Sequence, residues 1–210
     1  MSTMKFSSDD ATTLALIQKW RRDIRHFKTD PVPEDMLERL RAAMDSAPSV
    51  GNARPWRVVR VEDQRLRAAV RAEFERCNAL AADSYQANQQ GAYLNLKLAG
   101  LDAAPVQLAV FTCVDPDAGH RLGRQTLPDT LRQSVAMAIH AVWLTTRAEN
   151  LGPGMVSSPA PRHMETLFEV GPAYEFSAYL CIGWPQAVDD TPLLHRAAWQ
   201  QNLPTTWEVR

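Results

Sequence analysis

VQLAVFTCV, residues 106–114, is the stretch that best indicates the fold. It is an almost unbroken apolar run of strand length, which predicts a β-strand buried on both faces. The alternating, β-branched stretch WRVVRVED, residues 56–63, predicts a second strand, and EFSAYLCIGWP, residues 175–185, predicts a third, buried strand. A sheet with covered faces needs helices, and the segments around these strands have helical periodicity.

The first helix is expected in SSDDATTLALIQKW, residues 7–20, with Ser8 or Asp9 as its N-cap. Because helices come first and strands are then separated by helices of unequal length, the order indicates an α+β layered domain with a central mixed sheet flanked by helices. No repeat or low-complexity linker appears, so residues 1–210 are expected to form one domain. Further helices are expected within 30–48, 64–84, 92–101, 127–152 and 162–170, and a short strand within 154–158.

Two apolar regions indicate a partner chain. The middle of the long helix, residues 135–144, is apolar nearly all round and needs cover on every side. The tail, about residues 186–210, carries scattered leucines and tryptophans but no element that would bury them. We therefore expect a homodimer rather than a monomer, with the tail packing on the partner. His140, inside the apolar part of the helix, is expected to be an interior histidine rather than a metal ligand.

Composition narrows the class of protein. The 210 residues are 45% hydrophobic and 22% charged, with a formal net charge of −1 and a pI near 6.5. These values are typical of a globular protein and argue against binding to nucleic acid or to an anionic membrane. Three widely spaced cysteines, no signal-peptide pattern and no long apolar run predict a cytoplasmic protein. The five histidines do not fall at metal-ligand spacing, so no metal site is expected.

The stretch KWRRDIRHF, residues 19–27, places one carboxylate, Asp23, among Arg21, Arg22 and Arg25. Three guanidinium groups so close together can surround a phosphate. Neighbouring arginines lower the pKa of an aspartate by roughly 1–3 units, so Asp23 is expected to be anionic and able to accept a proton. An exposed cluster of surface ion pairs would produce the same pattern and stays open as the alternative.

Two loops offer polar groups to a ligand. APSVGNARPWR, residues 47–57, has the prolines, glycine and asparagine of a loop of defined shape, with Ser49 and Asn52 free to bind. GPGMVSSP, residues 152–159, would bring backbone amides and Ser157 close to a flat ligand. The alternatives are a plain helix-to-strand connection for the first and an ordinary turn into an edge strand for the second.

RRDIRHF, PSVGNARPW and LGPGMVS, in this order and spacing, resemble the flavin-binding segments of the nitroreductase-like FMN enzymes. Within that family, YLNLKLAGLDAAPVQLAVF, LGRQTLPDT and AVWLTTRAENLG are similar to the branch of the 5,6-dimethylbenzimidazole synthases, which make the lower ligand of cobalamin. The resemblance runs from about Arg21 to Pro185. It implies the family's layered α+β fold and a homodimer with FMN at the interface between subunits. General nitroreductases usually carry a serine where this chain has Asp23.

The resemblance also implies roles for single residues. The three arginines would hold the phosphate and ribityl end of FMN, Ser49 would touch the cofactor, and Leu98 would lie near it. Ser157 would approach the isoalloxazine, and Asn52, in the same loop as Ser49, is a further candidate contact. In the synthase branch reduced FMN and O2 are the substrates and the flavin is fragmented. The acid and the serine that match Asp23 and Ser157 are the residues essential to fragmentation in that branch.

Several positions around the ligand depart from the family pattern. Arg54 stands in place of a glutamine, Met155 of a tryptophan and Gln133 of a tyrosine; Asn202 stands where an arginine is frequent, and Arg196 is a candidate substitute for that arginine. These departures keep an NAD(P)H-dependent nitroreductase or flavin oxidoreductase, which recycles its FMN, open as the alternative function. A non-catalytic flavin-binding protein is the third. A synthase would need FMN reduced elsewhere, which implies a separate flavin reductase as a partner.

Overall fold

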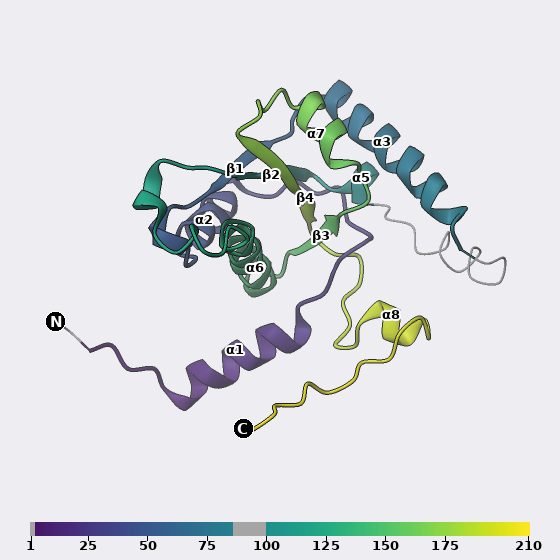
Figure 1. Ribbon diagram of the computed structural model, residues 1–210. Helices are drawn as coiled ribbons and strands as arrows, with labels where there is room; N and C mark the ends of the chain where they lie inside the picture. Colours follow the sequence, from purple (N-terminus) through teal and green to yellow (C-terminus); the bar gives the residue numbers. More distant parts are fainter. Residues whose placement is uncertain (1–2, 86–99) are drawn as a thin grey trace.

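The computed structural model describes residues 3–85 and 100–210, and its centre is a four-stranded sheet (Figure 1). The strands are β1 (Trp56–Arg60), β2 (Val106–Cys113), β3 (Gly152–Val156) and β4 (Tyr174–Gly183), in the order β1-β2-β4-β3. The α+β class is confirmed. The expected mixed sheet is wrong for the strands described, because each pair of neighbouring strands is antiparallel: β1 with β2, β2 with β4, and β4 with β3.

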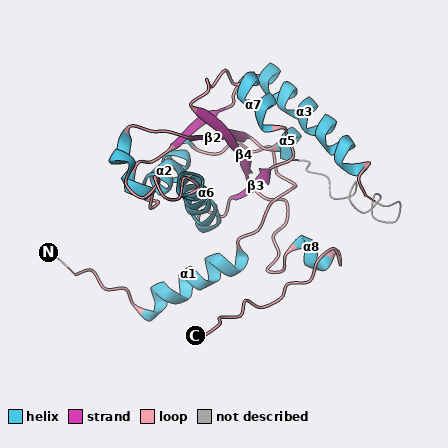
Figure 2. Ribbon diagram, viewed as in Figure 1, coloured by secondary structure: helices cyan, strands magenta, loops and turns pink. Residues whose placement is uncertain are grey.

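Helices cover both faces of the sheet (Figure 2). On one face α2 and α6 enclose a core that includes Val110 of β2, and on the other α3 and α7 pack over Ala109 and Phe111. The continuous apolar run of β2 therefore has two buried sides to fill, as expected. The described helices are α1 (Ser8–Trp20), α2 (Glu34–Asp45), α3 (Gln64–Ala82), α5 (Gly100–Ala103), α6 (Thr130–Ala148), α7 (Pro161–Leu167) and α8 (Leu193–Arg196), with 3-10 turns η1 (Val50–Asn52) and η2 (Ala118–Arg121).

The expected elements are present with shifted boundaries. α1 is capped by Ser7, one residue before the expected caps, because Ser7 and Asp10 form reciprocal capping bonds. Most of the helix expected over 92–101 lies outside the described residues, and α5 begins at Gly100. The short strand expected within 154–158 begins two residues early, at Gly152, because the Gly-Pro-Gly sequence is part of the strand.

The two ends of the chain lie away from the layered body (Figure 1). α1 buries none of its residues, and residues 200–210 are exposed, with Trp207 at 91%. The end of the tail thus has no cover in the described part of its own chain, in line with the expectation. His140 is exposed on α6, so the expectation of an interior histidine is wrong. It lies on a stripe with Ala136 and Met137 that the described elements leave uncovered.

Candidate functional site

Residues 21–27, here called the arginine segment, run alongside β3, one of the two edge strands of the described sheet. Alternate residues of an antiparallel strand point their backbone groups away from the partner strand. The carbonyl of Pro153 accepts a hydrogen bond from the N–H of Ile24 at 2.9 Å. The N–H of Met155 donates to Oδ1 of Asp23 at 2.8 Å. The edge of β3 therefore fixes both the backbone and the carboxylate of the arginine segment.

Two glycines of β3 make this close approach possible. A Cβ on Gly154 would lie closer than 3.0 Å to the carbonyl oxygen of Ile24, and a Cβ on Gly152 would collide with the Ile24 side chain. A larger residue fits at neither position while the arginine segment stays in place. For GPGMVSSP the edge strand is confirmed, and the expected turn is wrong because the glycines admit a neighbouring segment instead.

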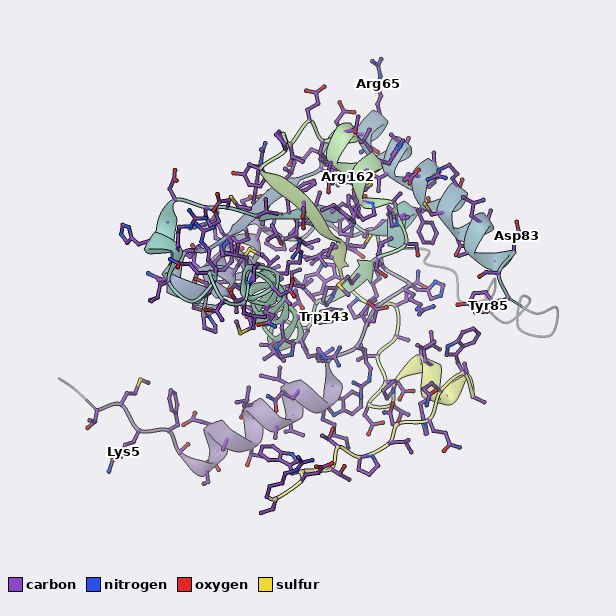
Figure 3. All side chains as sticks on the ribbon, in the orientation of Figure 1. Lys5, Arg65, Asp83, Tyr85, Trp143 and Arg162 are labelled. Carbon is purple, nitrogen blue, oxygen red and sulfur yellow. The ribbon has the colours of Figure 1, made fainter. Side chains whose placement is uncertain are left out.

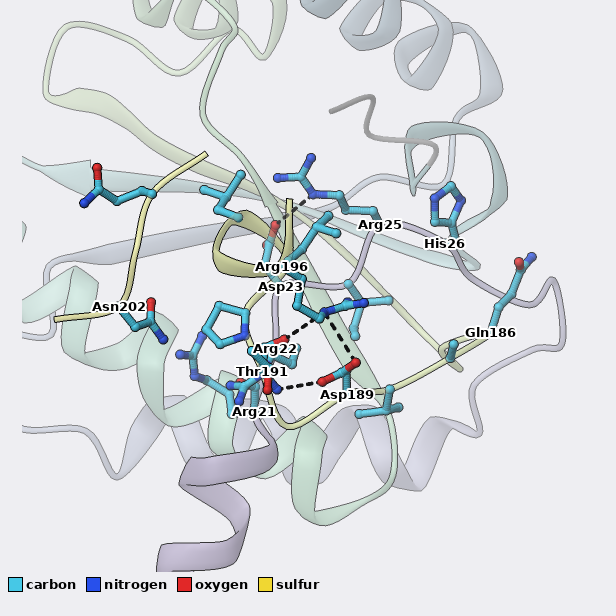
Figure 4. Close-up of a pocket in the computed structure, with 17 residues that line it drawn as sticks. Arg21, Arg22, Asp23, Arg25, His26, Gln186, Asp189, Thr191, Arg196 and Asn202 are labelled. Carbon is cyan, nitrogen blue, oxygen red and sulfur yellow. Dashed lines mark hydrogen bonds and ion pairs between the residues drawn. The ribbon is translucent and has the colours of Figure 1, made fainter. Parts of the chain in front are cut away.

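A cavity of about 570 Å3 lies between the arginine segment and residues 186–202 (Figure 4). Four guanidinium groups line this arginine cavity against two carboxylates, those of Asp23 and Asp189, so its wall carries net positive charge. Positive charge and forked N–H donors fit a phosphate, and the volume is that of a small-molecule site. The four groups belong to Arg21, Arg22, Arg25 and Arg196.

Polar contacts hold the C-terminal segment over the cavity. Lys19 pairs with Asp190 at 3.0 Å, and the guanidinium of Arg22 donates to the backbone carbonyl of Asp190. The ion pair between Nε of Arg196 and Asp189, 3.3 Å apart, lies within the C-terminal segment itself. Gln186 adds two hydrogen bonds to the arginine segment, from its backbone to the carbonyl of residue 26 and from its side chain to that of residue 27, each at 3.0 Å. The far wall of the cavity is thus tied to the near wall at several points.

The three arginines of the segment have different surroundings. Arg22 donates to the backbone carbonyls of Lys19, Arg21 and Asp190, and burial is the main cause that lowers its pKa. The guanidinium of Arg21 lies over the ring of Trp143, with 5.3 Å between Cζ and the ring centroid. The nearest atoms of Arg25 and Asp23 in their ion pair are 3.8 Å apart. Arg22 therefore stabilises the backbone around the cavity.

Burial raises the pKa of Asp23 above its ordinary value, against the lowering effects of the Met155 N–H, of Arg25 and of Arg21. Arg25 and Arg21 lower this pKa, as expected, but burial outweighs them, so the expected net direction of the shift is wrong. Neighbouring residues in the sequence show which charges are close to Asp23, but they do not show how far its carboxylate is removed from water. In addition, Nε of Arg25 comes no closer than 3.8 Å to that carboxylate. A carboxylate with a raised pKa is closer to proton exchange at neutral pH, which suits a residue that transfers protons.

The other expected site residues that the structure describes, Ser49, Asn52 and Ser157, lie outside the arginine cavity. Oγ of Ser49 accepts from the N–H of Arg54 at 3.0 Å, and the loop is tied to α6 through the N–H of Val50 and Oγ of Ser134. Asn52 is exposed in the same loop. Ser157 is exposed just beyond the end of β3, and Leu98 lies outside the described residues. The described part of one chain therefore does not bring Ser49, Asn52 and Ser157 into the cavity that the arginines line.

The departures from the family pattern fall in several places. Arg54 turns toward α2, where it pairs with Asp45 at 3.8 Å. Met155 lines a groove of about 440 Å3 between α6 and β4, together with Trp143 and Phe176. Gln133 is exposed on α6. Asn202 and Arg196 both line the arginine cavity.

Two residues that sequence reasoning gave no role contact the arginine segment. Trp143 donates its indole N–H to the carbonyl of Arg22 at 3.0 Å (Figure 3). Gln186 makes the two bonds described above. The sequence signal for Trp143 is a large aromatic residue with a polar tip inside an apolar helix, which needs a hydrogen-bond partner when buried. Gln186 directly follows a strand and has no comparable signal.

The described ranges contain no group of three side chains arranged to hold a metal ion. None of the helices that the structure describes has the length and apolar character needed to span a bilayer.

Comparisons with known proteins agree on one family. The model described as "Nitroreductase family" matches residues 19–184. A 5,6-dimethylbenzimidazole synthase of Rhodobacter capsulatus is 56% identical over 207 residues, 99% of this chain and 100% of that protein. That of Rhodospirillum rubrum is 49% identical over 190 residues, 90% of each chain. The fold is similar to the crystal structure of oxidized iodotyrosine deiodinase bound to FMN and 3-iodo-L-tyrosine, with a TM-score of 0.73 at 23% identity over 94% of this chain and 97% of that chain.

Proposed function

Because this chain belongs to the nitroreductase family, we propose that it is an FMN-using enzyme and that its reaction is the oxygen-dependent fragmentation of reduced FMN to 5,6-dimethylbenzimidazole. The observation that carries the proposal is the position of Asp23. It is an acid with a raised pKa in a cavity lined by four arginines. The near full-length identity of 56% to a protein named as that synthase supports the same reaction.

The cavity fits the phosphate end of FMN. Arg21, Arg25 and Arg196 would hold the phosphate, while Arg22 keeps the backbone around the cavity in place. FMN, when bound in reduced form, supplies the electrons that activate O2 and the carbon skeleton of the product. Oδ1 of Asp23 is engaged by the Met155 N–H, which leaves Oδ2 as the atom that takes up or releases a proton. Nε of Arg25 lies 3.8 Å from Oδ2, beyond hydrogen-bond distance, so this oxygen is the one that would accept a hydrogen bond from a substrate hydroxyl.

A homodimer would complete the site. Ser49 and Asn52 are candidate flavin contacts, yet they lie on a loop away from the arginine cavity of their own chain. A second copy could bring its equivalent loop to the cavity, and the exposed apolar residues of α1, α6 and the tail would gain cover there. Light scattering on the purified chain tests the dimer, and a monomer at micromolar concentration would contradict it.

The cytoplasmic location and the separate flavin reductase remain predictions.

The reaction is tested by loading the protein with reduced FMN without oxygen, admitting air and identifying the products by chromatography. We expect 5,6-dimethylbenzimidazole from the wild type and none from Asp23→Asn, although FMN binding is kept. Asp30→Asn changes an exposed aspartate outside the cavity and is the matched control. Undiminished product from Asp23→Asn would refute the role of Asp23. Steady NAD(P)H oxidation with intact flavin would show instead the nitroreductase or flavin oxidoreductase activity.

A further inference from the structure

Trp143 connects α6 to the arginine segment by two different contacts. Its indole N–H donates to the carbonyl oxygen of Arg22 at 3.0 Å, and its ring centroid lies 5.3 Å from Cζ of the Arg21 guanidinium. The side chain is half-buried. It does not line the arginine cavity, so any effect on a ligand there must pass through the arginines.

The first contact fixes the backbone next to the proposed proton-transferring residue. The carbonyl of Arg22 belongs to the peptide that leads into Asp23. On its other side Asp23 is held by the N–H of Met155 in β3. The position of the carboxylate is therefore set between a helix and a strand, two elements with rigid backbones.

The second contact fixes the side chain of Arg21. A long arginine side chain loses much rotamer freedom when it binds a phosphate, and stacking on an aromatic ring removes part of that freedom beforehand. The contact also keeps a positive charge near Asp23, where Arg21 already favours the ionised carboxylate.

We propose that Trp143 is a positioning residue, which holds Arg21 ready for the phosphate of the flavin and fixes the backbone that carries Asp23. This inference rests on the proposed function, since it takes the ligand of the arginine cavity to be FMN. It predicts that Trp143 contributes to the preference of the protein for FMN over riboflavin, which lacks the phosphate.

The test measures the affinity of the full-length protein, freed of flavin, for FMN and for riboflavin by fluorescence titration. Trp143→Leu removes both contacts, and Trp143→Phe keeps a ring but loses the N–H donor. We expect Trp143→Leu to reduce the preference for FMN by roughly five- to thirtyfold, and Trp143→Phe to reduce it less. Combined with Arg21→Gln, Trp143→Leu should reduce the preference no further, because the residue through which it acts is gone.

Trp184→Leu is the matched control. The indole N–H of Trp184 also donates to a backbone carbonyl, that of Pro31 at 3.3 Å, and Trp184 does not line the arginine cavity. It should leave the preference unchanged. Equal losses of FMN and riboflavin affinity in Trp143→Leu would show a merely structural role and overturn the inference. If Trp143→Leu does not fold, Trp143→Phe takes its place in the test. The inference is then overturned if Trp143→Phe prefers FMN as strongly as the wild type does and adding Arg21→Gln to it leaves that preference unchanged. A wild type that binds both flavins equally would refute the phosphate site itself, and with it the binding mode of the proposed function.

Discussion

Gly154→Ala is the substitution that most directly tests how the site is built. The backbone of Gly154 is not in the left-handed region, so alanine is conformationally acceptable there. On that ground alone the change would stabilise the protein by about 0.4–1 kcal/mol, because the unfolded chain loses freedom. The new methyl group, however, would collide with the carbonyl of Ile24, which is backbone and cannot rotate away.

The collision is relieved only if the arginine segment moves off β3. That movement breaks the bond from Ile24 N–H to Pro153 and the bond from Met155 N–H to Asp23. The first is a neutral bond, worth about 0.5–1.5 kcal/mol, and the second ends on a charged group, worth about 1.5–3 kcal/mol. Together the two bonds exceed the entropic gain, so we expect a net loss of about 1–4 kcal/mol in the free energy of unfolding and a weaker affinity for FMN.

Urea denaturation measures the stability and fluorescence titration measures the affinity. Gly171→Ala is the control, because its Cβ would meet open space and its positive φ of 38° adds only local strain. It should lower stability by about 1 kcal/mol and leave flavin affinity unchanged. A Gly154→Ala protein that is as stable as the wild type and binds FMN equally well would refute the close packing of the arginine segment on β3.

Three further predictions concern polar side chains with hydrogen-bond partners in the described structure. Because burial raises the pKa of Asp23, the folded state loses stability as the pH rises above the pKa that Asp23 has in the unfolded chain. Asp23→Asn should therefore raise the Tm at pH 7 but not at pH 3. An equal change in Tm at both pH values would contradict this. Hydrogen bonds from Arg76 are the main cause that lowers the pKa of Glu73 from 4.5 to about 2, so its stabilisation is present above pH 4.5 and is lost toward pH 2. Glu73→Gln should remove about 3 kcal/mol at pH 7 and abolish this pH dependence in urea titrations. Tyr179→Phe leaves Oε1 of buried Gln107 without its 2.7 Å donor and should cost about 1–3 kcal/mol in the same assay, whereas an unchanged midpoint would contradict it.

The secondary structure was largely predictable from the sequence because its local signals are strong. The apolar run of β2 corresponds to a strand buried on both faces. The helix expected over 127–152 corresponds to α6, although the stripe of Ala136, Met137 and His140 is uncovered in the described chain. Strand direction was not predictable, because a pattern of alternating strands and helices does not determine on which side each connection returns. The antiparallel sheet follows from long-range pairing that only the folded chain shows.

The grouping of the site residues was predictable from the sequence, but the geometry of the site was not. Arg21, Arg22, Arg25 and Asp23 are neighbours in the sequence and line one cavity, whereas their binding of a phosphate stays a prediction. The direction of the pKa shift of Asp23 was missed because it depends on burial, which adjacent residues do not encode. The role of Gly154 was missed for a similar reason. Its neighbour, Ile24, is 130 positions away in the sequence, so no local pattern reports their contact.

The outer edge of β3 has a consequence for solubility. A short strand at the border of a sheet normally presents unpaired N–H and C=O groups on which another chain can assemble. Here Pro153 has no N–H, its carbonyl is taken by Ile24, and the N–H of Met155 is taken by Asp23. The arginine segment, which is proposed to bind the flavin, thus also shields this edge of the sheet from self-association. Variants that detach the arginine segment from β3 in order to admit other ligands would expose the unpaired edge of this strand. Such variants are expected to aggregate as their specificity changes.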